Sequence, residues 1–344
     1  MTLLRVQDLQ IKFSTPEGEI TAVDHVSFEV NPGEVLGLVG ESGSGKSVTA
    51  RALMQLNASN TTYGENSKLL LETPGESVDI LALKSERQRR KVRGDLVSMI
   101  FQEPMASFAP ALTIGSQMCE QLKLHRGLRR PEAKDLSIQL LSRVGISDAA
   151  RRFDQYAFEL SGGMRQRAMI AMALSTKPSL LIADEPTTAL DVTIQAQVID
   201  LMKEIARDFG MGIIFITHDL GVIAQTADRV AVMYLGKIVE SGPVREVLHN
   251  PAHPYTRGLI NALPKLEDLE AQLTPVPGDI PSPLERPAGC VFHTRCPQFS
   301  KGTCEHAIPP QHLVGNEHFS ACHLHEEALA STLASAEHNQ GVPA

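Results

Sequence analysis

Residues 35–47 decide the fold. They read Val35-Leu36-Gly37-Leu38-Val39 and then Gly40-Glu41-Ser42-Gly43-Ser44-Gly45-Lys46-Ser47. The first five form a continuous apolar run, which is typical of a strand buried in a parallel sheet. The next eight fit the pattern G-x-x-x-x-G-K-[ST], and a helical stretch, Ser47–Leu56, follows them. A strand, a glycine-rich loop and a helix in this order predict a phosphate-binding loop in an α/β protein.

The loop suits the phosphates of a nucleotide. Its glycines let backbone N–H groups point at phosphate oxygens, and the start of the helix adds a partial positive charge. We expect Lys46 to reach the β- and γ-phosphates of ATP and Ser47 to ligate Mg²⁺. The alternative is a chance match in a glycine-rich loop. The predicted strand and helix on either side of the motif disfavour it. The predicted phosphate-binding residues are Gly40, Glu41, Ser42, Gly43, Ser44, Gly45, Lys46 and Ser47.

Two carboxylates end a second apolar run, Leu180-Leu181-Ile182-Ala183-Asp184-Glu185. Side chains at the carboxyl end of a parallel strand face the ligand crevice. We therefore expect Asp184 to hold Mg²⁺ through water, and Glu185 to orient or deprotonate the attacking water. The alternative is a strand that simply ends in a polar turn before Pro186.

The remaining pattern predicts an α/β fold with a mainly parallel sheet, because strand-like and helical stretches alternate over residues 1–250. This is a P-loop NTPase (RecA-like) core. Two alternating segments at the start predict an antiparallel β subdomain, and residues 105–165 have the helical periodicity of an insertion. The predicted elements include Leu4–Phe13, Ala22–Val30, Leu96–Phe101, Thr193–Phe209, Ile213–Ile216 and a hairpin over Arg229–Gly242.

Composition excludes some functions. The 344 residues include 32 Lys+Arg and 40 Asp+Glu, giving a net charge of −8, which argues against bulk binding to nucleic acid. No apolar run approaches the roughly 20 residues that cross a bilayer. Asp8 lies where a signal peptide needs an apolar region. We expect a cytosolic chain whose contact with a membrane is peripheral.

A small Pro/Cys-rich C-terminal extension, residues 251–344, is expected after a boundary near residue 250, because residues 251–310 hold 11 of the 21 prolines. Four cysteines follow the spacing C-x5-C-x7-C-x17-C, and in a cytosolic chain such a cluster indicates a metal site before disulfides. Four thiolates suit zinc or a [4Fe–4S] cluster, while unligated core residues are the third alternative. The cysteines are Cys290, Cys296, Cys304 and Cys322.

A basic run precedes the strand expected at 96–101. We interpret it as a solvated face instead of a nucleic-acid patch, because the net charge is negative and no aromatic residues are interleaved. The run consists of Lys84, Arg87, Arg89, Arg90, Lys91 and Arg93.

Four further segments resemble motifs of the ATP-binding cassette (ABC) ATPases, in the family's order. They are the Q-loop (Phe101-Gln102-Glu103-Pro104), the signature (Leu160-Ser161-Gly162-Gly163-Met164-Arg165-Gln166-Arg167), the D-loop (Ala189-Leu190-Asp191) and the switch histidine segment (Ile216-Thr217-His218-Asp219). The resemblance covers about residues 1–250, which we take as the nucleotide-binding domain. It implies that Gln102 senses Mg²⁺ and the attacking water and that His218 contacts the γ-phosphate. It also implies that Asp191 meets an opposing subunit and that Phe13 stacks on adenine.

The signature loop also has a physical rationale. Ser161, Gly162 and Gly163 open a helical run, and bare N–H groups with a hydroxyl at a helix start make a second anion site. In the family this loop completes the ATP site of another subunit. One P-loop and one signature per chain therefore imply a second ABC ATPase subunit, in a homodimer or a heterodimer.

The resemblance narrows to the ATPases of the peptide/nickel importers, such as the oligopeptide and dipeptide permease subunits. It rests on Phe13-Ser14-Thr15-Pro16, Ala183–Gln195 and His253-Pro254-Tyr255-Thr256, and on Gly289–Pro297 of the extension. The family's four cysteines imply a [4Fe–4S] cluster, with zinc as the alternative, although the second gap is one residue longer here. Glu103, Phe108 and Ala109 depart from the group's usual Asp, Leu and Asn, where a permease docks.

The resemblance implies an ATPase that works at the cytoplasmic face of the bacterial inner membrane. Its partners are two transmembrane permease subunits and, indirectly, an extracytoplasmic solute-binding protein, with no nucleic acid. The alternative is a soluble ABC ATPase that acts on nucleic acid or ribosomes, but such proteins usually have a long coiled coil or two cassettes. A third interpretation is a regulatory module that does not hydrolyse ATP. Such a module would have a substituted residue in the P-loop, the strand-end acids or the signature, and this sequence has none.

Overall fold

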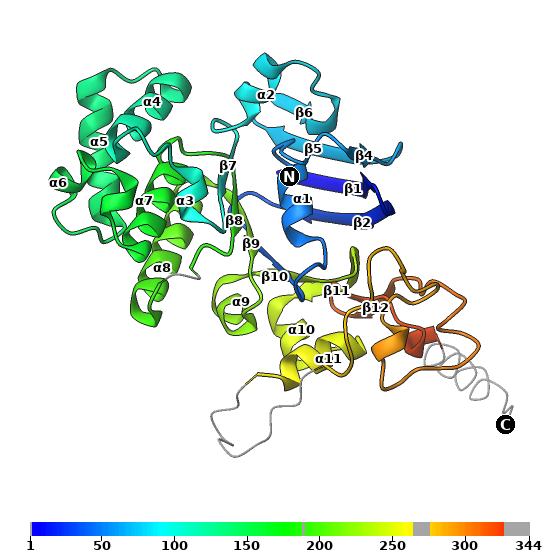
Figure 1. The fold of residues 1–344 in the computed structure, drawn as a ribbon. Helices are drawn as coiled ribbons and strands as arrows, with labels where there is room; N and C mark the ends of the chain where they lie inside the picture. The colour runs from blue at the N-terminus through cyan, green and yellow to red at the C-terminus, as the bar shows by residue number, and fades with distance from the viewer. Residues whose placement is uncertain (1, 188–189, 264–275, 327–344) are drawn as a thin grey trace, which may run out of the picture.

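The computed structural model describes residues 2–187, 190–263 and 276–326. Figure 1 shows an antiparallel sheet at the upper right, a helical lobe at the left, and a larger sheet between them. The C-terminal extension, yellow to red, lies below the larger sheet.

The N-terminal strands form the antiparallel sheet that the alternating segments predict. Leu4, Val6, Leu9 and Ile11 of β1 are buried in one core. A register shift between Val6 and Leu9, at Asp8 (φ 47°), interrupts the period of two and keeps all four side chains on the same face. The strand order is β2-β1-β5-β6, and β4 also pairs with β1. Three of these strands, β4, β5 and β6, were not predicted. The strands are β1 (Leu4–Thr15), β2 (Gly18–Val30), β4 (Thr61–Tyr63), β5 (Lys68–Thr73) and β6 (Glu76–Asp79).

The larger sheet has the strand order β12-β13-β11-β10-β3-β9-β8-β7. The run β10-β3-β9-β8-β7 is parallel, so the carboxyl ends of these strands meet at one edge. The parallel sheet is therefore confirmed. The strands are β3 (Val35–Val39), β7 (Val97–Ile100), β8 (Leu180–Asp184), β9 (Gly212–Ile216), β10 (Arg229–Tyr234), β11 (Lys237–Pro243), β12 (His312–Gly315) and β13 (His318–Ser320).

Both faces of the parallel strands are covered, which explains their continuous apolar sequences. Leu36 and Leu38 of β3 point into a core shared with the antiparallel sheet. Val35 and Val39 point to the opposite face, into a core shared with the helices. The covering helices include α1 (Lys46–Ala52), α7 (Gly162–Ser175), α8 (Val192–Phe209), α9 (Leu220–Thr226) and α10 (Val244–His249).

The predicted helical insertion is present as a lobe between β7 and β8. Its buried residues, such as Met118, Leu141 and Phe153, join the core on the helix-covered face of the larger sheet. The lobe therefore packs onto the body of the protein through its own apolar face. Its elements are α3 (Pro104–Ser107), α4 (Ile114–Arg126), α5 (Arg130–Arg143), α6 (Ala149–Phe153) and η2 (Ala157–Glu159).

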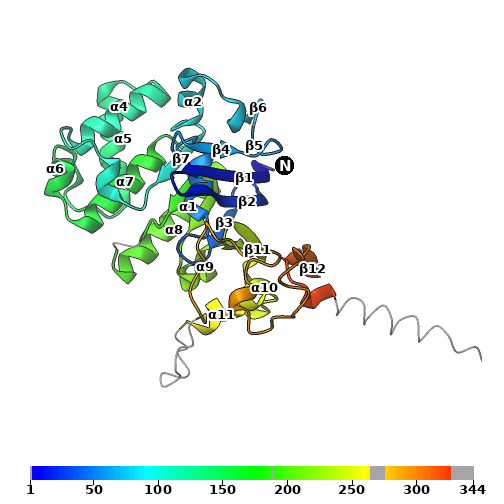
Figure 2. The ribbon, with the colours of Figure 1, turned by 45° about the vertical axis from the view of Figure 1, so that its right-hand side comes forward.

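The extension continues the larger sheet at its edge. It contains α11 (Pro254–Asn261), a 3₁₀ turn η3 (His293–Arg295), and the hairpin β12–β13. Strand β13 pairs with β11, with Glu240 opposite Ser320. Figure 2, a second view, again places the extension beside β11 and α10. The hairpin follows the proline-rich stretch, whose prolines disfavour regular strands.

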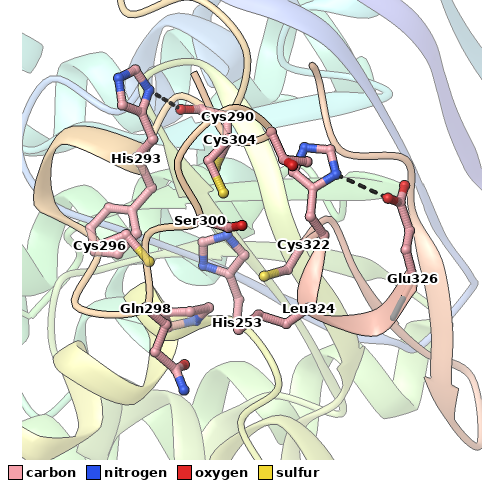
Figure 3. A pocket seen from close by; sticks show the side chains of 14 residues that line it. His253, Cys290, His293, Cys296, Gln298, Ser300, Cys304, Cys322, Leu324 and Glu326 are labelled. Atoms are coloured by element: carbon pink, nitrogen blue, oxygen red, sulfur yellow. Dashed lines mark hydrogen bonds and ion pairs between the residues drawn. The ribbon is translucent and has the colours of Figure 1, made fainter. Parts of the chain in front are cut away.

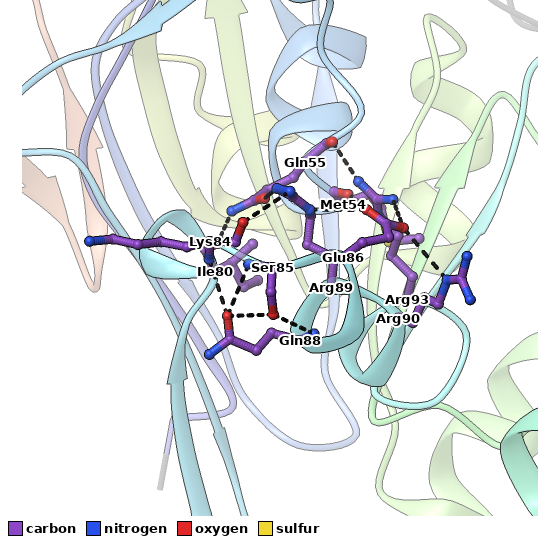
Figure 4. Close-up of polar contacts among 10 residues, drawn as sticks. All are labelled: Met54, Gln55, Ile80, Lys84, Ser85, Glu86, Gln88, Arg89, Arg90 and Arg93. Carbon is purple, nitrogen blue, oxygen red and sulfur yellow. Dashed lines mark hydrogen bonds and ion pairs between the residues drawn. The ribbon is translucent and has the colours of Figure 1, made fainter.

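The basic run follows η1 (Ile80–Ala82) and lies on α2 (Glu86–Val92) and the residues that flank it. Figure 4 shows that two of its arginines point toward the end of α1. Arg93 donates from Nε to the carbonyl of Met54 (2.7 Å) and from Nη2 to that of Gln55 (2.7 Å). Arg89 donates to Oε1 of Gln55 (3.3 Å). The solvated-face interpretation is therefore wrong for both arginines: Arg93 satisfies two main-chain carbonyls just beyond the helix end, and Arg89 binds the side-chain amide of Gln55.

Candidate active site

The P-loop links β3 to α1, as the motif predicts. Two of its glycines are sterically required. A Cβ on Gly40 (φ 149°) would lie 2.1 Å from the carbonyl oxygen of Met233, and one on Gly45 (φ 99°) would lie 2.5 Å from that of Ala22. The neighbouring backbone therefore allows no side chain at these two positions.

Lys46 is buried at the first position of α1, and its ammonium group binds acceptors of the loop. Nζ donates to the carbonyls of Gly40 (2.7 Å) and Glu41 (2.9 Å) and to Oγ of Ser44 (3.2 Å). Burial lowers the pKa of Lys46, while the carboxylates of Glu185 and Asp184 act to raise it. The site thus holds a desolvated cation beside the loop, which suits a phosphate ligand.

Ser47 and Asp184 meet although they are far apart in the sequence. The hydroxyl of Ser47 donates to Oδ1 of Asp184 at 3.2 Å. Burial raises the pKa of Asp184, and the nearby Glu185 carboxylate adds to this effect. A buried carboxylate next to a hydroxyl is a donor set that Mg²⁺ accepts. Two of the three residues predicted to hold or sense Mg²⁺, Ser47 and Asp184, are thus brought together.

Glu185 links the other two predicted catalytic residues. Gln102 donates from Nε2 to Oε2 of Glu185 at 3.2 Å, and Nδ1 of His218 lies 3.1 Å from Oε1. Glu185 has a φ of 49°, uncommon for a residue other than glycine, and its N–H donates to the carbonyl of Ile216 (2.9 Å). Such a backbone conformation is often found at functional sites.

These side chains surround one cavity of about 330 Å³. It is lined by residues 42–48 together with Gln102, Glu185 and His218, and by Ala22, which sequence reasoning missed. They come together because β3, β7, β8 and β9 are parallel and end at the same edge of the sheet. This arrangement can bind phosphates at the loop and place a carboxylate, an imidazole and an amide beside them.

Several predicted site residues do not line this cavity. Phe13 is half-buried in β1, opposite Ile20 and Thr61 of the neighbouring strands. Ser161 begins α7 and accepts from the N–H of Met164 (3.4 Å), with Gly162 and Gly163 following it. Asp191 begins α8 and accepts from the N–H of Ile194 (3.0 Å). Of the D-loop, Ala189 lies outside the described residues.

The extension reaches the P-loop through two residues that motif reasoning gave no role there. The hydroxyl of Tyr255 accepts from the backbone N–H of Glu41 (2.9 Å), and Arg295 forms an ion pair with the Glu41 carboxylate (2.7 Å). The side chain of Glu41 therefore contacts the extension. In the sequence, the only signal that draws attention to Arg295 is its position between Cys290 and Cys296, and this gives no sign of a contact with Glu41.

The four clustered cysteines line a second cavity, of about 220 Å³, in the extension. Figure 3 shows the four residues around it, with His253 and His293 nearby. All four are free thiols. Burial raises the pKa of Cys290 and of Cys322 to about 11. Within the described residues, no three His, Cys, Asp or Glu side chains are arranged to hold one metal ion between them.

Across the parts of the chain that the structure describes, no helix combines the length and the apolar character needed to traverse a bilayer.

Two family models match this chain, one in the ATPase part and one in the extension. Residues 23–188 match the model described as "ABC transporter". Residues 239–304 match the model described as "Oligopeptide/dipeptide transporter, C-terminal region". The second match includes Tyr255, Arg295 and three of the four cysteines.

Individual proteins extend the similarity to nearly the whole chain. A Brucella melitensis protein provisionally named a peptide import ATP-binding protein is 50% identical over 335 residues, which cover 95% of this chain and 98% of that protein. The oligopeptide transport ATP-binding protein OppD of Salmonella typhimurium is 46% identical and covers 95% of each chain. The dimeric ATP-binding cassette MJ0796, solved with ADP and phosphate, shares the fold at a TM-score of 0.63 and 23% identity, covering 70% of this chain and 99% of that one. This chain therefore belongs to the family of ABC transporter ATP-binding proteins, in the group with the oligopeptide/dipeptide C-terminal region.

Proposed function

We propose that the chain is the ATPase subunit of a bacterial ABC importer and that it hydrolyses MgATP to drive the uptake of peptides or a related small solute. The observation that carries the proposal is the cavity in which the P-loop meets Glu185, Gln102 and His218, with Asp184 bound to Ser47 of the loop. Two of its relatives are named for peptide import or oligopeptide transport and match it over nearly their full length.

In this proposal each residue of the cavity has a defined role. The P-loop and Lys46 bind the triphosphate, and Ser47, Asp184 and Gln102 hold Mg²⁺ directly or through water. Glu185 accepts a proton from the attacking water, and His218, 3.1 Å from Glu185, contacts the γ-phosphate. Positioning and charge neutralisation supply most of the rate enhancement. Phe13 stacks on adenine from outside the cavity described above.

Hydrolysis requires a second ATPase subunit. Ser161, Gly162 and Gly163 start α7 with N–H groups that suit an anion, but they do not line the P-loop cavity of their own chain. We therefore place them over the nucleotide of an opposing subunit, with Asp191 at the same interface. The cassette MJ0796, which shares the fold, is a dimer in its solved structure. A homodimer and a heterodimer both satisfy this geometry.

The remaining assignments concern organisation and partners. Residues 1–250 are the nucleotide-binding domain, with a helical part over about 105–165, and residues 251–344 are the peptide-importer extension. Two transmembrane permease subunits bind the chain at the cytoplasmic face of the inner membrane, and a solute-binding protein delivers the solute. Nothing in the comparisons favours the alternative of a soluble ATPase acting on nucleic acid or ribosomes.

The four cysteines are proposed as ligands of a [4Fe–4S] cluster, with zinc as the alternative. Four thiols at one cavity have the donor chemistry that a cluster needs. Because burial raises the pKa of Cys290 and Cys322, loading must displace protons from them. The side chains must also move, since no three described ligands are arranged around one ion. When bound, the cluster would staple a loop-rich segment.

The import proposal is tested in membranes that contain the natural partners. A tagged chain is purified with its membrane partners and reconstituted into vesicles with the solute-binding protein, and ATP-dependent uptake of labelled peptides is measured. We expect uptake with the wild-type chain and none with Lys46→Ala. ATP hydrolysis that drives uptake of a non-peptide solute, with no peptide uptake, would contradict the peptide assignment and leave the ATPase assignment intact.

A further inference from the structure

The C-terminal extension holds one residue of the P-loop by both its side chain and its main chain. Arg295 places Nη1 2.7 Å from Oε2 of Glu41 and Nη2 3.1 Å from Oε1. The hydroxyl of Tyr255 accepts from the N–H of Glu41 at 2.9 Å. A two-pronged arginine–carboxylate pair is strongly directional, so Glu41 is held in one orientation.

Arg295 is itself held in place on several sides. Its side chain is only 4% exposed. Nε donates to the carbonyl of Pro277 (2.9 Å) and Nη2 to that of Val276 (3.2 Å). The guanidinium carbon lies 5.7 Å from the centre of the Tyr234 ring. An arginine bound this tightly transmits any displacement of its own segment to Glu41.

Aromatic packing connects the same segment to the P-loop by a second route. Phe292 lies between Cys290 and Arg295 in the sequence and is fully buried. Its ring centre is 5.2 Å from that of Tyr234 and 5.3 Å from that of Tyr255. Tyr255 in turn binds the main chain of Glu41. The cysteine-lined segment is therefore packed against the residues that hold the loop.

The charge of Glu41 explains why the loop needs this arginine. The carbonyl of Glu41 accepts from Nζ of Lys46, so its carboxylate belongs to the residue next to the phosphate-binding cation. An unpaired carboxylate there would repel a triphosphate. Arg295 places a permanent positive charge directly on it.

We propose that Arg295 is a positioning residue for the nucleotide: it neutralises Glu41 and fixes the P-loop in the shape that receives phosphates. Since Arg295 lies between Cys290 and Cys296, order in the cysteine-lined segment and affinity for nucleotide are linked. Such linkage is reciprocal, so bound nucleotide also stabilises the segment. The inference goes beyond the proposed function and requires only that the chain binds ATP.

The first test measures the binding of Mg²⁺ with a non-hydrolysable ATP analogue to the full chain by titration calorimetry. Arg295→Met should raise Kd by about tenfold or more, as expected when a buried charge pair loses one partner. Arg295→Lys keeps the positive charge but loses the two-pronged contact of the guanidinium. Its Kd should therefore lie between the Kd of the wild type and that of Arg295→Met. The matched control is Arg286→Met, which removes a half-buried arginine of the extension that pairs with Asp24 of β2 (3.1 Å). The control should bind as the wild type does.

A double variant separates charge pairing from mere structural support. Removing both charges in Glu41→Gln/Arg295→Met should restore Kd to within about threefold of the wild type, because the two residues are directly coupled. A role in structure alone predicts that the double variant binds at least as weakly as Arg295→Met. Unchanged Kd in folded Arg295→Met, or no recovery in the double variant, overturns the proposal. Thermal unfolding shows whether each variant is folded. If Arg295→Met does not fold, Arg295→Lys replaces it in the binding measurement.

The reciprocal effect is measured by hydrogen exchange of peptides over residues 285–300. The nucleotide analogue should slow their exchange in the wild type and in Arg286→Met, but not in Glu41→Gln/Arg295→Met. Equal exchange with and without nucleotide in the wild type would contradict the linkage. Neither measurement uses a permease or a peptide, so a failure here is distinct from a failure of the import proposal.

Discussion

The carboxylate of Glu185 lies 3.1 Å from Nδ1 of His218, across the gap between two parallel strands. Glu185 follows β8 and His218 follows β9, and the pairing of Asp184 with Ile216 brings the two strand ends level. Gln102 reaches the other carboxylate oxygen from the end of β7. The sheet thus brings two predicted catalytic side chains, an amide and an imidazole, to the carboxylate of the third beside the P-loop.

Replacing this carboxylate should separate ATP binding from hydrolysis. Glu185→Gln keeps the size of the side chain and its hydrogen bonding but cannot accept the proton of water. Turnover of ATP should fall by at least about 10²-fold, the scale of lost general-base catalysis, while nucleotide binding persists and a closed dimer accumulates. Phosphate release and gel filtration with ATP measure both effects. Glu103→Gln, the same change at an exposed neighbouring carboxylate, is the control, and a wild-type rate in Glu185→Gln would show that Glu185 is not the base.

The signature loop should act on the opposing subunit. Ser161→Arg places a bulky side chain at the start of α7, where the wild-type hydroxyl accepts from Met164. Hydrolysis should be abolished, while the isolated monomer binds ATP almost as well as the wild type. The matched control is Ser142→Arg on the exposed surface of the helical lobe, which should retain hydrolysis. If Ser161→Arg monomers lose nucleotide binding, the loop serves its own chain and the shared-site model is wrong.

The cysteine site makes a prediction about metal content. Protein purified without oxygen should be brown, absorb near 400 nm and contain about four irons per chain. Cys290→Ser or Cys296→Ser should lose the iron and loosen residues 285–325 in hydrogen exchange, because a loop-rich segment depends on its staple.

The lone Cys119→Ser is the matched control and should keep the iron. Colourless protein with one tightly held zinc would overturn the iron–sulfur assignment but keep a metal staple. Metal-free protein with an ordered extension would contradict both.

His253 should make folding stability depend on pH. Burial lowers the pKa of His253 from 6.5 to about 4. Between these values the unfolded chain binds a proton that the folded chain does not, so stability is present above pH 6.5 and is lost as the pH falls toward 4. The slope is at most about 1.4 kcal/mol of unfolding free energy per pH unit.

The measurement is urea unfolding between pH 7 and 5. Nδ1 of His253 accepts from the N–H of Tyr255 at 3.1 Å, so protonation there would also break the start of α11. His253→Asn can accept the same bond without titrating and should show a flatter dependence on pH. Other titrating groups are common to both proteins, so equal slopes would contradict the role of His253.

Local sequence determined the parallel strands, the loop and the chemistry of the ATP site. The apolar run at Val35–Val39 and the motif after it specify a strand and a phosphate loop, because both depend on neighbouring residues alone. The same holds for the acids that end β8. Since parallel strands end at one edge, even the meeting of Glu185 with the P-loop follows from the order of the elements.

Only the tertiary structure decided how the extension relates to this site. Glu41 and Arg295 are separated by 254 positions, and no local period or spacing connects them. Likewise, Arg89 and Arg93 belong to a basic run that resembles a solvated face. Only packing brings Arg93 to the main-chain carbonyls of Met54 and Gln55, and Arg89 to the side-chain amide of Gln55. A sequence motif depends on residues that are close together in the chain. A buried ion pair between distant segments forms only when the folded core brings its two partners together.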